Sequence, residues 1–191
     1  MKRGLMWLVV LIILGGCPVP VEPFKASDVS GAAFGRDFRL LDHTGRMRTL
    51  KDFRGKVVLL SFGYTHCPDI CPTTLTELAA VMARLGAQAQ NVQVLFVTLD
   101  PARDTPALLA RYLPFFYTDF LGLSSDETTT AATAREFRVL YQKQDYGSQA
   151  GYSLDHSTGI YAFDRQGRLR LFIAYESGVD DIVHDVRLLL R

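Results

Sequence analysis

The fold is decided by one stretch of the chain, VVLLSFGYTHCPDICP at residues 57–72. Its first part, Val57 to Gly63, is a continuous run of mostly β-branched and apolar residues, which is typical of a strand buried on both faces. The segment Thr73 to Gly86 follows with apolar residues at helical spacing, and its final glycine is suited to end a helix. We therefore expect a buried strand that leads through a cysteine-containing turn into a helix.

Apolar segments at strand or helix spacing continue on both sides of this stretch. In chain order we expect strands at Phe38–Leu41 and Met47–Leu50 around a turn, a strand at Val92–Leu99, helices at Ala107–Leu113 and Glu127–Tyr141, strands at Gly159–Asp164 and Arg168–Ala174, and a helix at Val179–Leu190. The strand–helix–strand opening implies a parallel pair with a right-handed crossover, while the hairpins add antiparallel strands. This order predicts an α/β protein with a thioredoxin-like fold, in which helices flank a central mixed sheet and a β-hairpin comes first.

The region before the last hairpin is expected to contain a helix and then a loop. The helix at Glu127–Tyr141 would direct Phe137, Val139 and Leu140 into the core. The segment Gln142–Ser153 is rich in glycine, serine and aspartate, and these residues favour a loop.

Length and composition limit the classes of protein to consider. The chain has 191 residues, of which 48% are hydrophobic, and a formal net charge of +1. Such a chain can bury the core of one domain, which excludes a disordered protein. It has no basic run that would attract nucleic acid, so no nucleic-acid partner is expected.

The first residues have the pattern of an export signal. Lys2 and Arg3 precede the apolar segment Gly4–Gly16, which is shorter than the ~20 residues that a membrane-spanning helix needs. The residues before Cys17 also resemble a bacterial lipoprotein signal, in which the cysteine is diacylated and becomes the new N-terminus. The alternative is an uncleaved membrane anchor.

These features divide the chain into three parts. We expect a lipoprotein-type signal peptide at residues 1–16, a lipidated N-terminus and flexible proline-rich tether at 17–30, and the thioredoxin-like domain at 31–191. The expected location is the bacterial cell envelope, with the protein lipid-anchored to the outer face of the cytoplasmic membrane.

With Cys17 assigned to the lipid, Cys67 and Cys71 are the remaining thiols. In an oxidising compartment such a pair forms a disulfide or a soft metal site. Residues four apart share a helix face, so both sulfurs could point to one spot at the helix N-terminus, which stabilises thiolates. Asp69 is placed to act as the N-cap. The alternative is a fixed structural disulfide, which would constrain little of the unfolded chain.

The histidines offer further candidate ligands. His156 precedes an expected buried strand, and such a strand start lies against the cysteine turn in thioredoxin-like folds. On this basis alone His156 is either a metal ligand or a structural histidine. His66 is expected to point to solvent, with a role as an accessory ligand as the alternative, and His43 and His184 are expected at the surface.

Three motifs now occur in order: YTHCPDICP at 64–72, TLDPARDTP at 98–106 and YSLDHSTGIYAFD at 152–164. With them, the chain from about Phe34 to its C-terminus resembles the Sco/SenC family of copper-binding, thioredoxin-fold proteins that assist cytochrome c oxidase assembly. The resemblance implies one copper per chain, as Cu(I) or Cu(II), with Cys67, Cys71 and His156 as ligands.

The resemblance also implies a function and partners. The expected function is that of a membrane-tethered metallochaperone for the CuA centre, with cytochrome c oxidase subunit II as its partner. An upstream copper donor or a thiol reductant would be a further partner, and the protein is expected to be a monomer. Among the nearby residues, Asp155 is a candidate to orient His156, and Tyr64 is expected to pack beside the site. Asp100, Arg103 and Asp104 either support the site from the end of a strand or form a turn with a local ion pair.

Two other functions use the same thiols. In a thiol–disulfide oxidoreductase that keeps the oxidase cysteines reduced, Cys67 and Cys71 are the catalytic pair: Cys67 attacks a partner disulfide and Cys71 resolves the intermediate. A thiol peroxidase of the glutathione-peroxidase type needs a tryptophan at its site, and the only tryptophan, Trp7, lies in the expected signal peptide.

Overall fold

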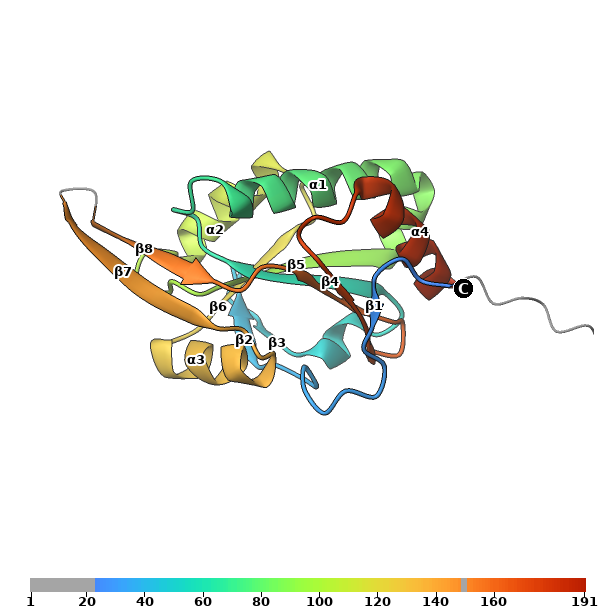
Figure 1. Cartoon of the computed structure of the whole chain (residues 1–191), viewed down its shortest axis with the longest axis horizontal. Coiled ribbons are helices and arrows are strands. Elements are labelled where there is room, and N and C mark those ends of the chain that lie inside the picture. Colours follow the sequence, from blue (N-terminus) through green and yellow to red (C-terminus); the bar gives the residue numbers. More distant parts are fainter. Residues whose placement is uncertain (1–22, 149–150) are drawn as a thin grey trace, which may run out of the picture.

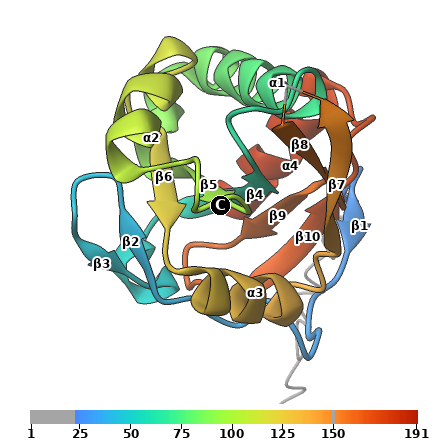
Figure 2. The ribbon, with the colours of Figure 1, turned by 90° about the vertical axis from the view of Figure 1, so that its left-hand side faces the viewer.

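A computed structural model describes residues 23–148 and 151–191, and a mixed eight-stranded sheet runs through its centre (Figure 1). In the order β1-β10-β9-β4-β5-β6-β2-β3, its strands are Ser27–Asp28, Leu169–Ile173, Ile160–Phe163, Val57–Gly63, Val92–Thr98, Leu121–Ser124, Leu40–Asp42 and Met47–Arg48. The helices are α1 (Ile70–Leu85), α2 (Pro106–Tyr112), α3 (Glu127–Glu136) and α4 (Val179–Leu190). Helices α1, α2 and α4 lie on one side of the sheet and α3 on the other (Figure 2). The predicted α/β class, with helices flanking a mixed sheet, is confirmed.

Strand β4 occupies the middle of the sheet, as its sequence predicts. It pairs in parallel with β5 and antiparallel with β9. All seven of its residues are buried, since sheet and helices cover both faces. The cysteine turn follows the last residue of β4, so it lies at the centre of the sheet, at the edge where the parallel strands end.

The helix after this turn begins earlier than its apolar pattern indicates. Helix α1 starts at Ile70 rather than at Thr73, so Cys71 and Pro72 belong to its first turn. Proline is tolerated there because the first amide groups of a helix have no partner within it. Helix α1 packs against α4, whose predicted bounds, Val179 to Leu190, agree with the structure.

The prediction for the third helix was wrong at its C-terminal end. Helix α3 stops at Glu136 because Arg138 adopts a left-handed conformation, with φ of 56°. The amide of Val139 then donates to the carbonyl of Ala134, which is the closing bond of a Schellman motif. Phe137 and Val139 are buried as predicted, but Leu140 lies outside the helix and is 78% exposed.

The loop predicted at Gln142–Ser153 was also wrong. This region forms a separate two-stranded sheet, β7 (Tyr141–Ser148) and β8 (Gly151–His156), which projects from the body of the molecule (Figure 1). Strand β6 was not predicted either, since it has four residues and includes a glycine. The two-stranded sheet determines where His156 lies, because this residue is the last of β8.

The described chain begins inside the segment expected to be a tether. Within that segment, β1 pairs with β10, and the amides of Lys25 and Ala26 donate to the buried carboxylate of Asp185. The predicted signal peptide and Cys17 lie outside the described residues. Within residues 23–148 and 151–191, no helix has both the length and the hydropathy needed to cross a bilayer.

Candidate metal centre

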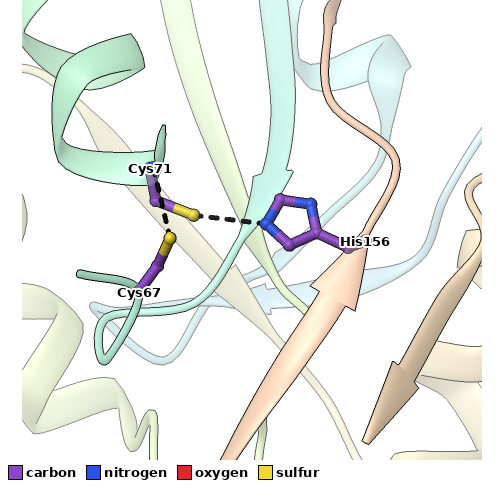
Figure 3. A group of neighbouring side chains, drawn as sticks. All are labelled: Cys67, Cys71 and His156. Atoms are coloured by element: carbon purple, nitrogen blue, oxygen red, sulfur yellow. Dashed lines mark hydrogen bonds between the residues drawn. The ribbon is translucent and has the colours of Figure 1, made fainter. Parts of the chain in front are cut away.

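The two cysteines lie on either side of the start of α1, rather than on one face of it (Figure 3). Cys67 belongs to the loop before the helix, so the prediction that both cysteines share one helix face was wrong for this residue. The sulfurs still converge, because the loop folds back and the Cys71 amide donates to the Cys67 sulfur at 3.5 Å. One of the unpaired amides of the helix N-terminus is thus used to hold a sulfur.

The imidazole of His156 reaches this pair from the end of β8 (Figure 3). Its Nε2 atom lies 3.4 Å from the Cys71 sulfur, while Nδ1 lies 2.9 Å from the carbonyl oxygen of Ser157. Because a carbonyl only accepts, Nδ1 carries the proton in this contact. This contact selects the tautomer whose Nε2 atom has its lone pair directed at the thiols.

Cys67, Cys71 and His156 together form a donor set for a soft metal. Their ligand atoms all lie within 4.8 Å of one another, and both cysteines are free thiols. Two sulfurs and one imidazole nitrogen fit copper, since Cu(I) prefers thiolates and the imidazole also suits Cu(II). A structural zinc site usually has four protein ligands, and in the described part of the chain no further histidine, cysteine or carboxylate joins the group.

Packing against the strand fixes the inner thiol, Cys71, which is 3% exposed. A Cβ atom on Gly63 would lie only 2.7 Å from its sulfur, so glycine at the end of β4 makes room for the thiol. Burial raises the pKa of the Cys71 thiol above its ordinary value. Cys67 is half-buried, which leaves it as the outer and more accessible sulfur.

A buried carboxylate braces the loop that carries Cys67. The side chain of Asp104 accepts hydrogen bonds from the amide and the hydroxyl of Thr65, at 2.9 and 2.5 Å. It also accepts one from the hydroxyl of Thr98 at 2.7 Å, and its exposed fraction is 0%. The expected supporting role of Asp104 has this structural basis, because the contacts tie the start of the cysteine loop to the end of β5.

A second network connects the same edge to β8. Arg103 forms an ion pair with Asp100 and donates to the carbonyl of Tyr152 at 2.8 Å, while the Tyr152 hydroxyl donates to Asp100 at 2.7 Å. The Arg103 guanidinium also stacks on the Tyr152 ring, 3.7 Å from its centroid. Tyr64 packs edge-on against His156, as expected. Sequence reasoning missed Tyr152 because its partners are distant along the chain.

Other expected roles are not found. The carboxylate of Asp155 accepts from Gln144 rather than from His156, whose Nδ1 is taken by a backbone carbonyl. Asp69 is the N-cap residue of α1, but its side chain makes no capping hydrogen bond. His66 is exposed, as expected, and contacts Thr65, so its alternative role as an accessory ligand is not found.

The two remaining histidines lie away from the group. His43 accepts from the amide of Gly122 and is half-buried, while His184 lies beside the carboxylate of Asp185. Both were expected at the surface, but each is partly covered by the residues it contacts.

Comparison with known proteins places this geometry in a family. A sequence profile described as SCO1/SenC matches residues 26–191. The mitochondrial SCO2 homologue of Bos taurus is 42% identical over 159 residues, which cover 82% of this chain and 60% of that protein. An SCO2-like protein of Rickettsia felis is 33% identical over 150 residues, covering 78% and 73%. The chain thus spans less than two thirds of its mammalian relative.

Solved structures give the same result. Bradyrhizobium japonicum ScoI with copper bound superposes with a TM-score of 0.74 and 37% identity, over 81% of this chain and 98% of that one. Yeast Sco1 with copper bound gives a TM-score of 0.70 and 33% identity, over 81% and 88%. Sequence and fold agree, and we conclude that the chain belongs to the SCO1/SenC family.

Proposed function

We propose that this protein binds one copper ion through Cys67, Cys71 and His156 and assists assembly of the CuA centre in subunit II of cytochrome c oxidase. The observation that carries the proposal is the convergence of two thiols and one imidazole lone pair at the edge of the sheet. Copper-bound relatives of the same fold, 37% and 33% identical, support it. The copper is cargo to be handed on, so the half-buried outer thiol is the side from which a partner would approach.

Copper binding is the first test. The reduced protein is expected to bind one equivalent of Cu(I) or Cu(II), and the Cu(II) form should show an intense thiolate-to-copper charge-transfer band. Oxidation to the Cys67–Cys71 disulfide should release the metal, because a disulfide sulfur is no longer a thiolate ligand. Metal analysis and absorption spectra of the reduced and the disulfide forms measure the bound copper and the charge-transfer band. A reduced protein that takes up no copper would refute the proposal.

A second candidate function is reduction of the oxidase subunit, and the unequal burial of the two thiols favours it. The outer Cys67 would attack one sulfur of a client disulfide and release the first client thiol. The inner Cys71 would then attack Cys67, release the second client thiol and leave the Cys67–Cys71 disulfide. Under this function alone, His156→Ala would leave client reduction largely unchanged, and wild-type protein would show no charge-transfer band with Cu(II).

Membrane tethering is a further part of the proposal. Acylation at Cys17 would hold the domain at the outer face of the cytoplasmic membrane. From there the protein could reach the copper domain of an oxidase subunit without leaving the membrane. Cys17→Ser is expected to leave an uncleaved or soluble protein whose copper binding is intact. Intact-mass analysis of membrane-extracted protein makes the test: a mature chain that starts elsewhere than residue 17, or that carries no lipid, contradicts the lipoprotein interpretation.

A further inference from the structure

Ser61 is a buried polar residue that the proposed function does not use. It lies in the centre of β4 and is 3% exposed. Within the described part of the chain, its hydroxyl and one nitrogen of Arg103 are the buried side-chain polar atoms without a hydrogen-bond partner. Buried hydroxyl groups in folded proteins are paired in most cases with protein or with an ordered water. The environment of Ser61 should therefore contain a partner for it.

A small cavity lies next to this hydroxyl. Its volume is about 10 Å³, and Ser61 lines it together with Cys71, His156, Thr74 and Thr158. A space of roughly 10–15 Å³ for the centre of a water molecule is what one buried water requires, along with two to four polar partners. The hydroxyl, the thiol and the imidazole provide such partners in one place.

The geometry of β4 directs Ser61 toward the inner thiol. Side chains two residues apart on a strand share a face, and Gly63, two residues further on, lies directly under the Cys71 sulfur. Phe96, which is opposite Ser61 on β5, lines the same cavity. The hydroxyl of Ser61 thus lies on the sheet face against which Cys71 packs.

We infer that one buried water links the Ser61 hydroxyl to the Cys71 sulfur, and that Ser61 is a positioning residue for this ligand. A hydrogen bond to a sulfur withdraws electron density from it, and such bonds tune both copper–thiolate sites and thiols. Ser61 would thereby set how strongly Cys71 donates to copper and how readily the thiol pair is oxidised. The copper part of this inference rests on the proposed function, whereas the thiol part does not.

Ser61→Ala is the test, with Ser124→Ala as a matched control on β6. Loss of the water should move the thiolate-to-Cu(II) band to longer wavelength, because the sulfur lone pair becomes higher in energy. It should also favour oxidation by glutathione disulfide, in which the two protein thiols form a disulfide and two glutathione thiols are released. An increase of about two- to tenfold in that equilibrium constant corresponds to one net hydrogen bond. Ser124→Ala should change neither quantity.

A crystal structure of the reduced wild-type protein provides the direct observation. A water within hydrogen-bond distance of the Ser61 hydroxyl and the Cys71 sulfur, absent in Ser61→Ala, supports the inference. A dry cavity overturns it, as does an unchanged band or an unchanged glutathione equilibrium in a Ser61→Ala variant that unfolds at the wild-type temperature. If wild-type protein binds no copper, the proposed function fails, while the crystal structure and the glutathione equilibrium still decide the role of Ser61.

Discussion

Replacing either Cys67 or Cys71 by serine is expected to abolish binding of both Cu(I) and Cu(II). Each substitution removes one of two soft ligands from a set of three, and a hydroxyl does not replace a thiolate for copper. Changes to residues that only support a ligand already weaken metal binding by about 10–100-fold, so the loss should exceed that range. Competition titrations against a copper chelator of known affinity measure it.

His156→Ala is expected to separate the two oxidation states. The substitution removes the one nitrogen donor of the group but leaves the thiol pair, which by itself satisfies Cu(I). Cu(II) affinity should therefore fall far more than Cu(I) affinity, with loss or displacement of the charge-transfer band. The matched control is His66→Ala, which removes an exposed imidazole next to Cys67 that does not face the thiols. Equal losses for the two ions, or equal effects of the two variants, would rule out His156 as the ligand that accommodates Cu(II).

The central part of the fold could be predicted because its strands and helices have clear apolar patterns in short stretches of sequence. A run of seven apolar and small residues has few options other than a buried strand, and β4 has the predicted bounds. Helix α4 likewise has a continuous apolar stripe. The end of α3 could not be predicted, since its closing motif uses Arg138 in a conformation that usually requires glycine. The sequence around Arg138 therefore gave no stop signal.

The supports of the candidate site could be predicted only in part: Asp104 and Tyr64 lie beside it as expected, whereas Asp155 does not contact His156. The three donors came from the family resemblance, and the spacing argument from Cys67 to Cys71 assumed a helix that begins only at Ile70. The partner of His156 was assigned to the adjacent carboxylate of Asp155, yet it is the carbonyl of Ser157. A backbone partner leaves no mark in the sequence, because every residue has a carbonyl. The hairpin that brings His156 to the thiols was missed because its strands are largely polar and lack the apolar pattern that predicts a strand.

Among these supports, Asp104 should have the largest effect on stability. Its carboxylate is fully buried and accepts three hydrogen bonds, two from Thr65 and one from Thr98. Asp104→Ala would remove all three bonds: the buried Thr98 hydroxyl loses its acceptor at a cost of about 1–3 kcal/mol, and each bond to the half-buried Thr65 contributes about 0.5–1.5 kcal/mol. We therefore expect the free energy of unfolding to fall by about 3 kcal/mol or more, with weaker copper binding because the loop before Cys67 loses its brace.

Comparison with Asp69→Ala distinguishes this brace from a general effect of charge near the thiols. Asp69 also belongs to the cysteine turn, but its side chain is exposed and makes no capping hydrogen bond, so its removal should change stability by no more than about 0.5 kcal/mol. Asp104→Asn keeps one acceptor oxygen but turns an amide toward the threonine donors, and should therefore lie between the two alanine variants. Chemical unfolding and copper titration of the three proteins measure both effects. If Asp104→Ala retained wild-type stability, or lost no more than Asp69→Ala, the hydrogen bonds to Thr65 and Thr98 would not be what positions the Cys67 loop.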